Sequence, residues 1–188
     1  MSDLVSVSLI SPRIVRVRIG EPRYPSLAVI KGEEEESGGP IVSIDEDAVH
    51  VRFNEEEINA YYSVSGDETI IRSELRPFDR VYGLGEKALP LNRKRYRVTM
   101  WNTDAYGYRL GSDPLYVSIP FFIILRNGNA IGHFIDSPAR MVMDMGQENL
   151  NEIKIRIQDS AVDHYIIYGP SIKDVIKGYH ELTGKPFL

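Results

Sequence analysis

The amino-acid sequence predicts a mainly β protein, an antiparallel β-sandwich with one helix towards its C-terminal end. Short segments in which apolar and polar residues alternate recur along most of the 188-residue chain, as expected of strands with one buried face. Clusters of turn-forming residues separate these segments at short intervals. Apolar residues at helical spacing occur clearly in one place, near the end of the chain. Together these patterns favour a sandwich or barrel.

The first two strands are expected at residues 5–9 and 14–19, with Ser11 and Pro12 as the turn between them. Asn127 and Gly128 give the clearest hairpin signal, because both residues readily adopt a positive φ. The other expected strands are 41–44, 49–53, 58–64, 69–75, 81–82, 95–101, 118–125, 130–136, 140–144, 150–157 and 163–168.

A single helix is expected between Ser171, which can act as its N-cap, and Gly184. The residues that recur at helical spacing and predict its apolar face are Ile172, Val175, Ile176 and Tyr179. Residues 31–40 contain the acidic run Glu33–Glu36 together with glycines and a proline. A solvated loop is expected there, with a functional acidic segment as the alternative.

The composition limits the classes of function. Hydrophobic residues make up 43% of the chain and charged residues 26%, which is typical of a globular domain with a core. Cysteine is absent, which excludes disulfides, thiolate zinc sites and cysteine nucleophiles and suits a cytoplasmic location. The net charge of −5 opposes nucleic-acid binding. The longest apolar run, residues 119–125, is too short to span a bilayer, so no membrane partner is expected.

The string from Gly83 to Ala88 satisfies the G-x-G-x-x-G/A pattern of dinucleotide-binding loops. That pattern needs a helix to start at the glycines, and Pro90 interrupts any helix there. We therefore expect the two glycines to allow a close backbone approach or a bulge at a sheet edge.

Four basic residues, Arg93, Lys94, Arg95 and Arg97, lie close to Tyr96 and Trp101. Such a mixture could bind single-stranded nucleic acid, but a solvated loop or ion pairs with the acidic surface fits the net charge better. The histidines, His50, His133, His164 and His180, are scattered without metal-ligand spacing. No metal and no cofactor is expected, and no serine lies in a G-x-S-x-G setting.

Residues 96–116 combine five aromatic residues with amide, carboxylate and arginine side chains. A carbohydrate site needs flat apolar surfaces beside such hydrogen-bonding groups. The alternative is a long loop whose aromatic residues pack over the edge of the sandwich. The composition of the segment leaves both interpretations open.

Three blocks of sequence resemble the N-terminal region of glycoside hydrolase family 31, the α-glucosidase family. Residues 82–86 read Y-G-L-G-E, residues 101–104 read W-N-T-D, and residues 114–121 read P-L-Y-V-S-I-P-F. A fourth block, residues 168–186, is similar to the G-P…Y-x-x-L-T-G-x-P connection that leads into the catalytic barrel of that family.

The resemblance implies a galactose-mutarotase-like β-sandwich at residues 1–169, followed at 170–188 by a helix and linker into a (β/α)8 barrel outside this chain. It also implies a retaining α-glucosidase, in which one carboxylate attacks the sugar and another acts as acid and base. The family's W-x-D-M-x-E nucleophile motif is absent from these residues. No catalytic residue is therefore expected here, and the barrel of the same polypeptide is the expected partner.

In the family, the aspartate of the W-N-x-D block bonds sugar hydroxyls, and Asp104 is the matching residue. Thr103 and Asn102 are weaker candidates for substrate binding, and Trp101 is expected to anchor the loop. The expected substrates are maltose and short malto-oligosaccharides. The alternatives are another activity of the family, such as an α-xylosidase, or a stand-alone carbohydrate-binding or mutarotase-like module. A contact between subunits of a homo-oligomer is also compatible with the sequence.

Overall fold

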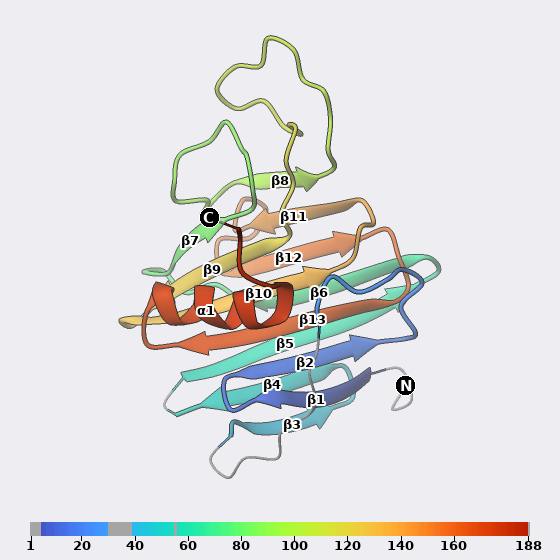
Figure 1. Ribbon diagram of the computed structural model, residues 1–188, viewed down its shortest axis with the longest axis vertical. Helices are drawn as coiled ribbons and strands as arrows, with labels where there is room; N and C mark the ends of the chain where they lie inside the picture. The colour runs from blue at the N-terminus through green and yellow to red at the C-terminus, as the bar shows by residue number, and fades with distance from the viewer. Residues whose placement is uncertain (1–4, 30–38, 55, 188) are drawn as a thin grey trace.

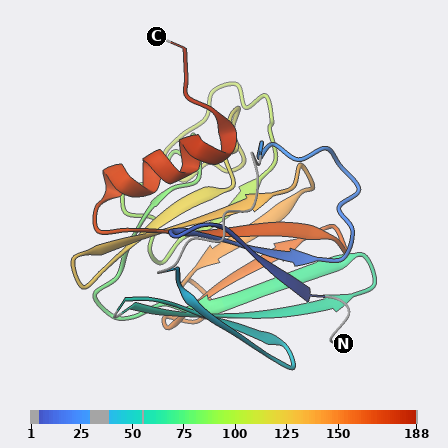
Figure 2. The same ribbon diagram turned by 60° about the horizontal axis from the view of Figure 1, so that its bottom comes forward.

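A computed structural model describes residues 5–29, 39–54 and 56–187. Two antiparallel sheets face each other, and one helix lies on the outer side of one of them (Figures 1 and 2). This confirms the predicted sandwich with a C-terminal helix. The acidic run Glu33–Glu36 lies outside the described residues.

The first sheet has six strands. In spatial order they are β1 (Val5–Ser11), β2 (Ile14–Ile19), β13 (Val162–Gly169), β10 (Asn129–Asp136), β9 (Phe121–Arg126) and β7 (Arg80–Gly83). The second sheet has seven strands. They are β3 (Ile41–Asp45), β4 (Ala48–Phe53), β5 (Glu56–Ser65), β6 (Glu68–Glu74), β12 (Glu152–Ile157), β11 (Met141–Met145) and β8 (Arg97–Met100).

The main core lies between the two sheets and is built by every second residue of the central strands. Val15, Val17 and Ile19 of β2 face it, as do Ile153, Ile155 and Ile157 of β12. This alternation of buried and partly exposed residues is the pattern that predicted the strands. Strand β13 is buried along its whole length, because the second sheet covers one face and the helix packs on the other.

The turns form where the sequence places them. Arg126 pairs with Asn129, so Asn127 and Gly128 are the two central residues of the β9–β10 hairpin, and both have a positive φ (50° and 85°). Two positive φ angles are the signature of a type I′ turn. The opening hairpin, β1 with β2, is also present as predicted, but its turn lies one residue later, at Pro12 and Arg13, because Ser11 still pairs with Ile14.

Helix α1 (Ile172–Thr183) has Ser171 as its N-cap, as predicted, and the Ser171 hydroxyl accepts a hydrogen bond from the amide of Asp174. The predicted apolar face is only partly correct. Ile172 and Ile176 are exposed, whereas Val175, Gly178 and Leu182 are buried against the six-stranded sheet.

Small residues on both elements turn the helix to this face. A Cβ atom on Gly178 would lie 2.6 Å from Cγ2 of Ile167 on β13. A Cβ atom on Gly132 of β10 would lie 2.5 Å from Cγ1 of Val175. At each of these contacts a glycine on one element leaves room for a side chain of the other, so the helix can approach the sheet closely.

Three predicted strands begin two or three residues later than expected, at β8, β9 and β12. Arg95 has a positive φ of 72°, which interrupts the extended backbone before β8. Residues 118–120 belong to the loop before β9, and residues 150–151 form a turn before β12.

Candidate functional site

The three sequence blocks at residues 82–86, 101–104 and 114–121 lie against one another at one end of the sandwich. The loops that follow β7 and β8 project together from this end (Figure 1). The amide of Leu84 donates to the Phe121 carbonyl at 2.9 Å, and that of Glu86 to the Val117 carbonyl at 2.9 Å. Segments that are separate in the sequence therefore form one continuous structure.

The two glycines of the first block make this contact possible. A Cβ atom on Gly83 would lie 2.6 Å from the Phe121 carbonyl oxygen, and one on Gly85 would lie 2.6 Å from that of Val117. Both glycines have a positive φ, and β7 is an edge strand. The expectation of close backbone approach is confirmed. The dinucleotide-binding pattern requires a helix after the glycines, and the structure has no helix between residues 84 and 96.

Asn102 and Thr103 hold the second block against the third. The Asn102 side-chain oxygen accepts from the Ser118 amide at 2.8 Å, and the Ser118 hydroxyl accepts from the Trp101 amide at 3.0 Å. The Thr103 amide donates to the Leu115 carbonyl at 2.9 Å. These contacts fix the backbone immediately before Asp104.

Asp104 is exposed at the end of this tied segment. The hydroxyl of Tyr116 lies beside its carboxylate. Desolvation, and then this neighbouring carboxylate, raise the pKa of Tyr116. The phenol therefore stays protonated and can orient the carboxylate, which keeps acceptor capacity for a ligand.

Aromatic residues flank Asp104 in the sequence, and their side chains are largely open to solvent. Tyr106 is fully exposed, and Trp101 and Tyr108 are each about half exposed. Tyr108 packs edge-on against Tyr116, with ring centroids 6.4 Å apart. The aromatic residues of this segment thus form an exposed surface and are not packed down over the sandwich edge.

A groove of about 320 Å³ runs beside the start of the loop. Trp101, Asn102 and Ser118 line it on the loop side, and Ser137 and Met141 line it on the sandwich side. Its lining residues carry no charge, and Asp104 is not one of them.

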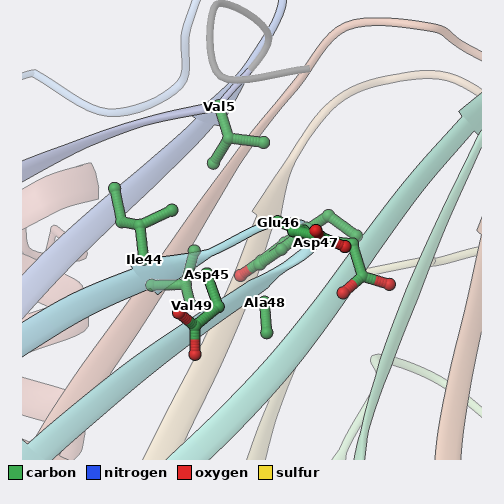
Figure 3. Close-up of a pocket in the computed structure, with 8 residues that line it drawn as sticks. Val5, Ile44, Asp45, Glu46, Asp47, Ala48 and Val49 are labelled. Carbon is green, nitrogen blue, oxygen red and sulfur yellow. The ribbon is translucent and has the colours of Figure 1, made fainter.

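A second hollow, of about 630 Å³, lies far from this loop along the chain, at the β3–β4 hairpin (Figure 3). Val5, Ile44, Val49 and Tyr62 contribute its apolar lining. Three consecutive acidic residues, 45–47, also line it, and the last two of them form the hairpin turn. It contains acidic side chains but no histidine, lysine or arginine.

The basic cluster is used within the fold. Arg93 donates to the carbonyls of Leu89 and Pro90 at 2.7 Å each. Arg97 forms ion pairs with Asp144 at 2.9 Å and with Glu148 at 3.3 Å. The expected ion pairs are therefore present for Arg97, whereas Arg93 satisfies backbone carbonyls.

Two histidines that are scattered in the sequence meet in the core. Nδ1 of His133 on β10 lies 3.0 Å from Nε2 of His164 on β13, and the Tyr62 hydroxyl lies 2.8 Å from Nδ1 of His164. The antiparallel pairing of β10 with β13 creates this contact. Because both rings are almost completely buried, they do not form a cleft in which a sugar could bind.

Among the described residues, no group of three or more His, Asp or Glu side chains is arranged to hold a metal ion. Within the same part of the chain, no helix has the length and apolarity that crossing a bilayer requires.

Comparisons with known proteins show which family and fold the chain resembles. Residues 60–144 match the family model of the glycosyl hydrolase 31 N-terminal galactose mutarotase-like domain. An α-glucosidase of Saccharolobus solfataricus is 45% identical over 123 residues, which cover 65% of this chain and 18% of that protein. The α-xylosidase XylQ of Lactiplantibacillus pentosus is 33% identical over 106 residues, which cover 56% of this chain and 13% of that protein.

Among solved structures, a Flavobacterium johnsoniae dextranase of the same family superposes with a TM-score of 0.80 at 23% identity. The superposition covers 97% of this chain and 26% of the dextranase, and it supports the fold alone. The chain spans less than a fifth of the length of the two sequence relatives. Over residues 60–144 it carries the match to the N-terminal galactose mutarotase-like domain of glycoside hydrolase family 31.

Proposed function

We propose that this domain is the N-terminal part of a retaining α-glucosidase that removes terminal α-linked glucose from maltose and short malto-oligosaccharides. In this proposal residues 1–169 form the sandwich, and residues 170–188 lead into a catalytic barrel that contains the nucleophile and the acid. A cytoplasmic location is part of the proposal and rests on the cysteine-free composition.

The observation that carries the proposal is the assembly of three separate sequence blocks around Asp104. The blocks are bonded to one another through backbone amides and the Asn102 side chain, and they present an exposed carboxylate among exposed aromatic rings. Carboxylate oxygens accept hydrogen bonds from sugar hydroxyls, and aromatic faces pack on the apolar faces of sugar rings. The 45% identity to an α-glucosidase favours glucose as the sugar that is recognised.

An α-xylosidase is the second candidate, because two α-xylosidases are also among the relatives, at 33% and 28% identity. A xyloside lacks the hydroxymethyl group of a glucoside, and residues outside this chain would select between them.

The natural polypeptide that contains this domain should be assayed with maltose, 4-nitrophenyl α-glucoside and 4-nitrophenyl α-xyloside. We expect release of glucose and a higher kcat/KM for the glucoside. A higher kcat/KM for the xyloside would support the second candidate. Absence of hydrolysis, with a native mass near 21.4 kDa, would favour a stand-alone sugar-binding module.

A further inference from the structure

A buried ion pair lies beneath the loop that carries Asp104. The side chain of Lys87 is completely buried, and that of Asp113 is 15% exposed. Nζ of Lys87 lies 2.9 Å from the Asp113 carboxylate and donates to the Thr99 carbonyl at 2.6 Å. The other carboxylate oxygen of Asp113 accepts from the Thr99 amide at 2.5 Å.

These contacts close the loop at its base. Thr99 lies at the end of β8, just before the loop, and Asp113 lies at its return. Lys87 holds both ends at once, because it contacts Thr99 and Asp113 with the same ammonium group. A further backbone bond, from the Gly111 amide to the Ala88 carbonyl at 2.7 Å, joins the returning chain to the segment that contains Lys87.

We propose that Lys87 and Asp113 are positioning residues, which set the place of Asp104 by fixing both ends of its loop. This inference rests on the proposed function, in which Asp104 binds the sugar. Lys87 cannot itself contact a substrate, because its side chain has no exposed surface. A buried ion pair adds little net stability but favours one geometry over others, because misplacing either charge leaves the other unpaired in the interior.

A matched control exists on the neighbouring segment. Nζ of Lys94 also donates to two backbone carbonyls, those of Arg76 and Pro77, at 2.6 Å each. It therefore joins two chain segments through its ammonium group, as Lys87 does, but its acceptors are carbonyl oxygens and the segments are not those of the Asp104 loop. Substitution of Lys94 therefore shows how the loss of a lysine that joins two segments affects the protein when the contacts of the Asp104 loop remain in place.

The first test needs no enzymatic activity. Trp101 is the only tryptophan of this chain, and it lies two residues after Thr99. In Lys87→Gln we expect stronger acrylamide quenching and a red shift of the Trp101 emission, with neither change in Lys94→Gln. If Lys87→Gln unfolds the chain, the same measurement is made on the double variant Lys87→Gln/Asp113→Asn, which leaves no unpaired charge in the interior. A folded variant with the emission and quenching of the wild type would overturn the proposal.

The second test separates positioning from general stability by a double-mutant cycle in the full-length protein. We expect Lys87→Gln to lower kcat/KM for maltose about 10-fold, and less than about 2-fold when Asp104 is already alanine. Equal losses in both backgrounds would show that Lys87 does not act through Asp104 and would overturn the inference. An unchanged kcat/KM in Asp104→Ala would contradict the proposed function, and the Trp101 emission would then decide whether Lys87 positions the loop.

Discussion

Arg126 and Asp79 form an ion pair in which both side chains are only 3% exposed. Nη2 of Arg126 lies 2.6 Å from Oδ2 of Asp79, and it also donates to the Glu74 carbonyl at 3.0 Å. Asp79 in turn accepts from the Arg76 amide at 2.8 Å. The pair joins the end of β9 to the chain that enters β7, so it braces the edge of the six-stranded sheet.

Asp79→Asn and Arg126→Met should each lower the free energy of unfolding by about 3 to 5 kcal/mol, because each leaves one buried charge without its partner. The double variant should be more stable than the two losses added together, since it leaves no unpaired charge. Urea unfolding of this chain measures all three variants. Strictly additive losses would contradict this account.

The buried histidines predict a loss of stability in acid. Burial, followed by the neighbouring His164 and Arg126, lowers the pKa of His133 well below its ordinary value, and burial lowers the pKa of His164 to about 3. The unfolded chain binds these protons near pH 6.5, whereas the folded chain excludes them. Stability is therefore complete above about pH 6.5 and is lost as the pH falls towards 3, by up to about 1.4 kcal/mol per pH unit for each histidine.

Urea unfolding between pH 7 and pH 4.5 measures this slope. His164→Phe should flatten it, because one of the two groups no longer titrates. His50→Gln is the control, since His50 lies on β4 outside the core and bonds Asn59. A slope in His164→Phe equal to that of the wild type would show that another group causes the acid sensitivity.

The close approach of α1 to the sheet predicts a specific compensation. Gly132→Ala should cost about 1 to 3 kcal/mol, because its Cβ atom would lie 2.5 Å from Cγ1 of Val175. The cost should fall when Val175 is also alanine, since the clashing methyl group is then absent. Thermal unfolding of the two single variants and the double variant measures the coupling. Additive losses would mean that Gly132 does not set the helix position.

Trp101→Phe should lower the Tm of this chain while it leaves the KM of the full-length protein for maltose nearly unchanged. The indole is half buried beside the groove, and the backbone amide next to it bonds Ser118. Losing part of the buried ring area should cost about 1 kcal/mol. A raised KM with an unchanged Tm would instead identify Trp101 as a sugar-stacking residue.

Local chemistry accounts for what the sequence predicts well. The β9–β10 hairpin follows from the φ preferences of Asn127 and Gly128, and the start of α1 follows from the Ser171 cap. These features depend on residues that are close in the sequence. Strands with one partly exposed face, such as β2 and β12, follow in the same way from their own alternation.

Features that depend on distant segments were not predictable from the sequence. The buried face of α1 depends on Gly132, which lies 43 positions before Val175 on another element. The contact of His133 with His164 depends on the register of β10 with β13. The Lys87–Asp113 pair likewise has no local signal, because only the folded loop brings its two ends together.

The most direct test of the account is kcat/KM for maltose in the full-length protein with Asp104→Ala, compared with Asp67→Ala. Asp67 is an exposed carboxylate in the β5–β6 turn, distant from the candidate site along the chain. We expect Asp104→Ala to lower kcat/KM by about 10- to 100-fold, the loss of a hydrogen bond to a charged group, and Asp67→Ala to leave it unchanged. Equal kcat/KM values for wild type and Asp104→Ala would contradict the account.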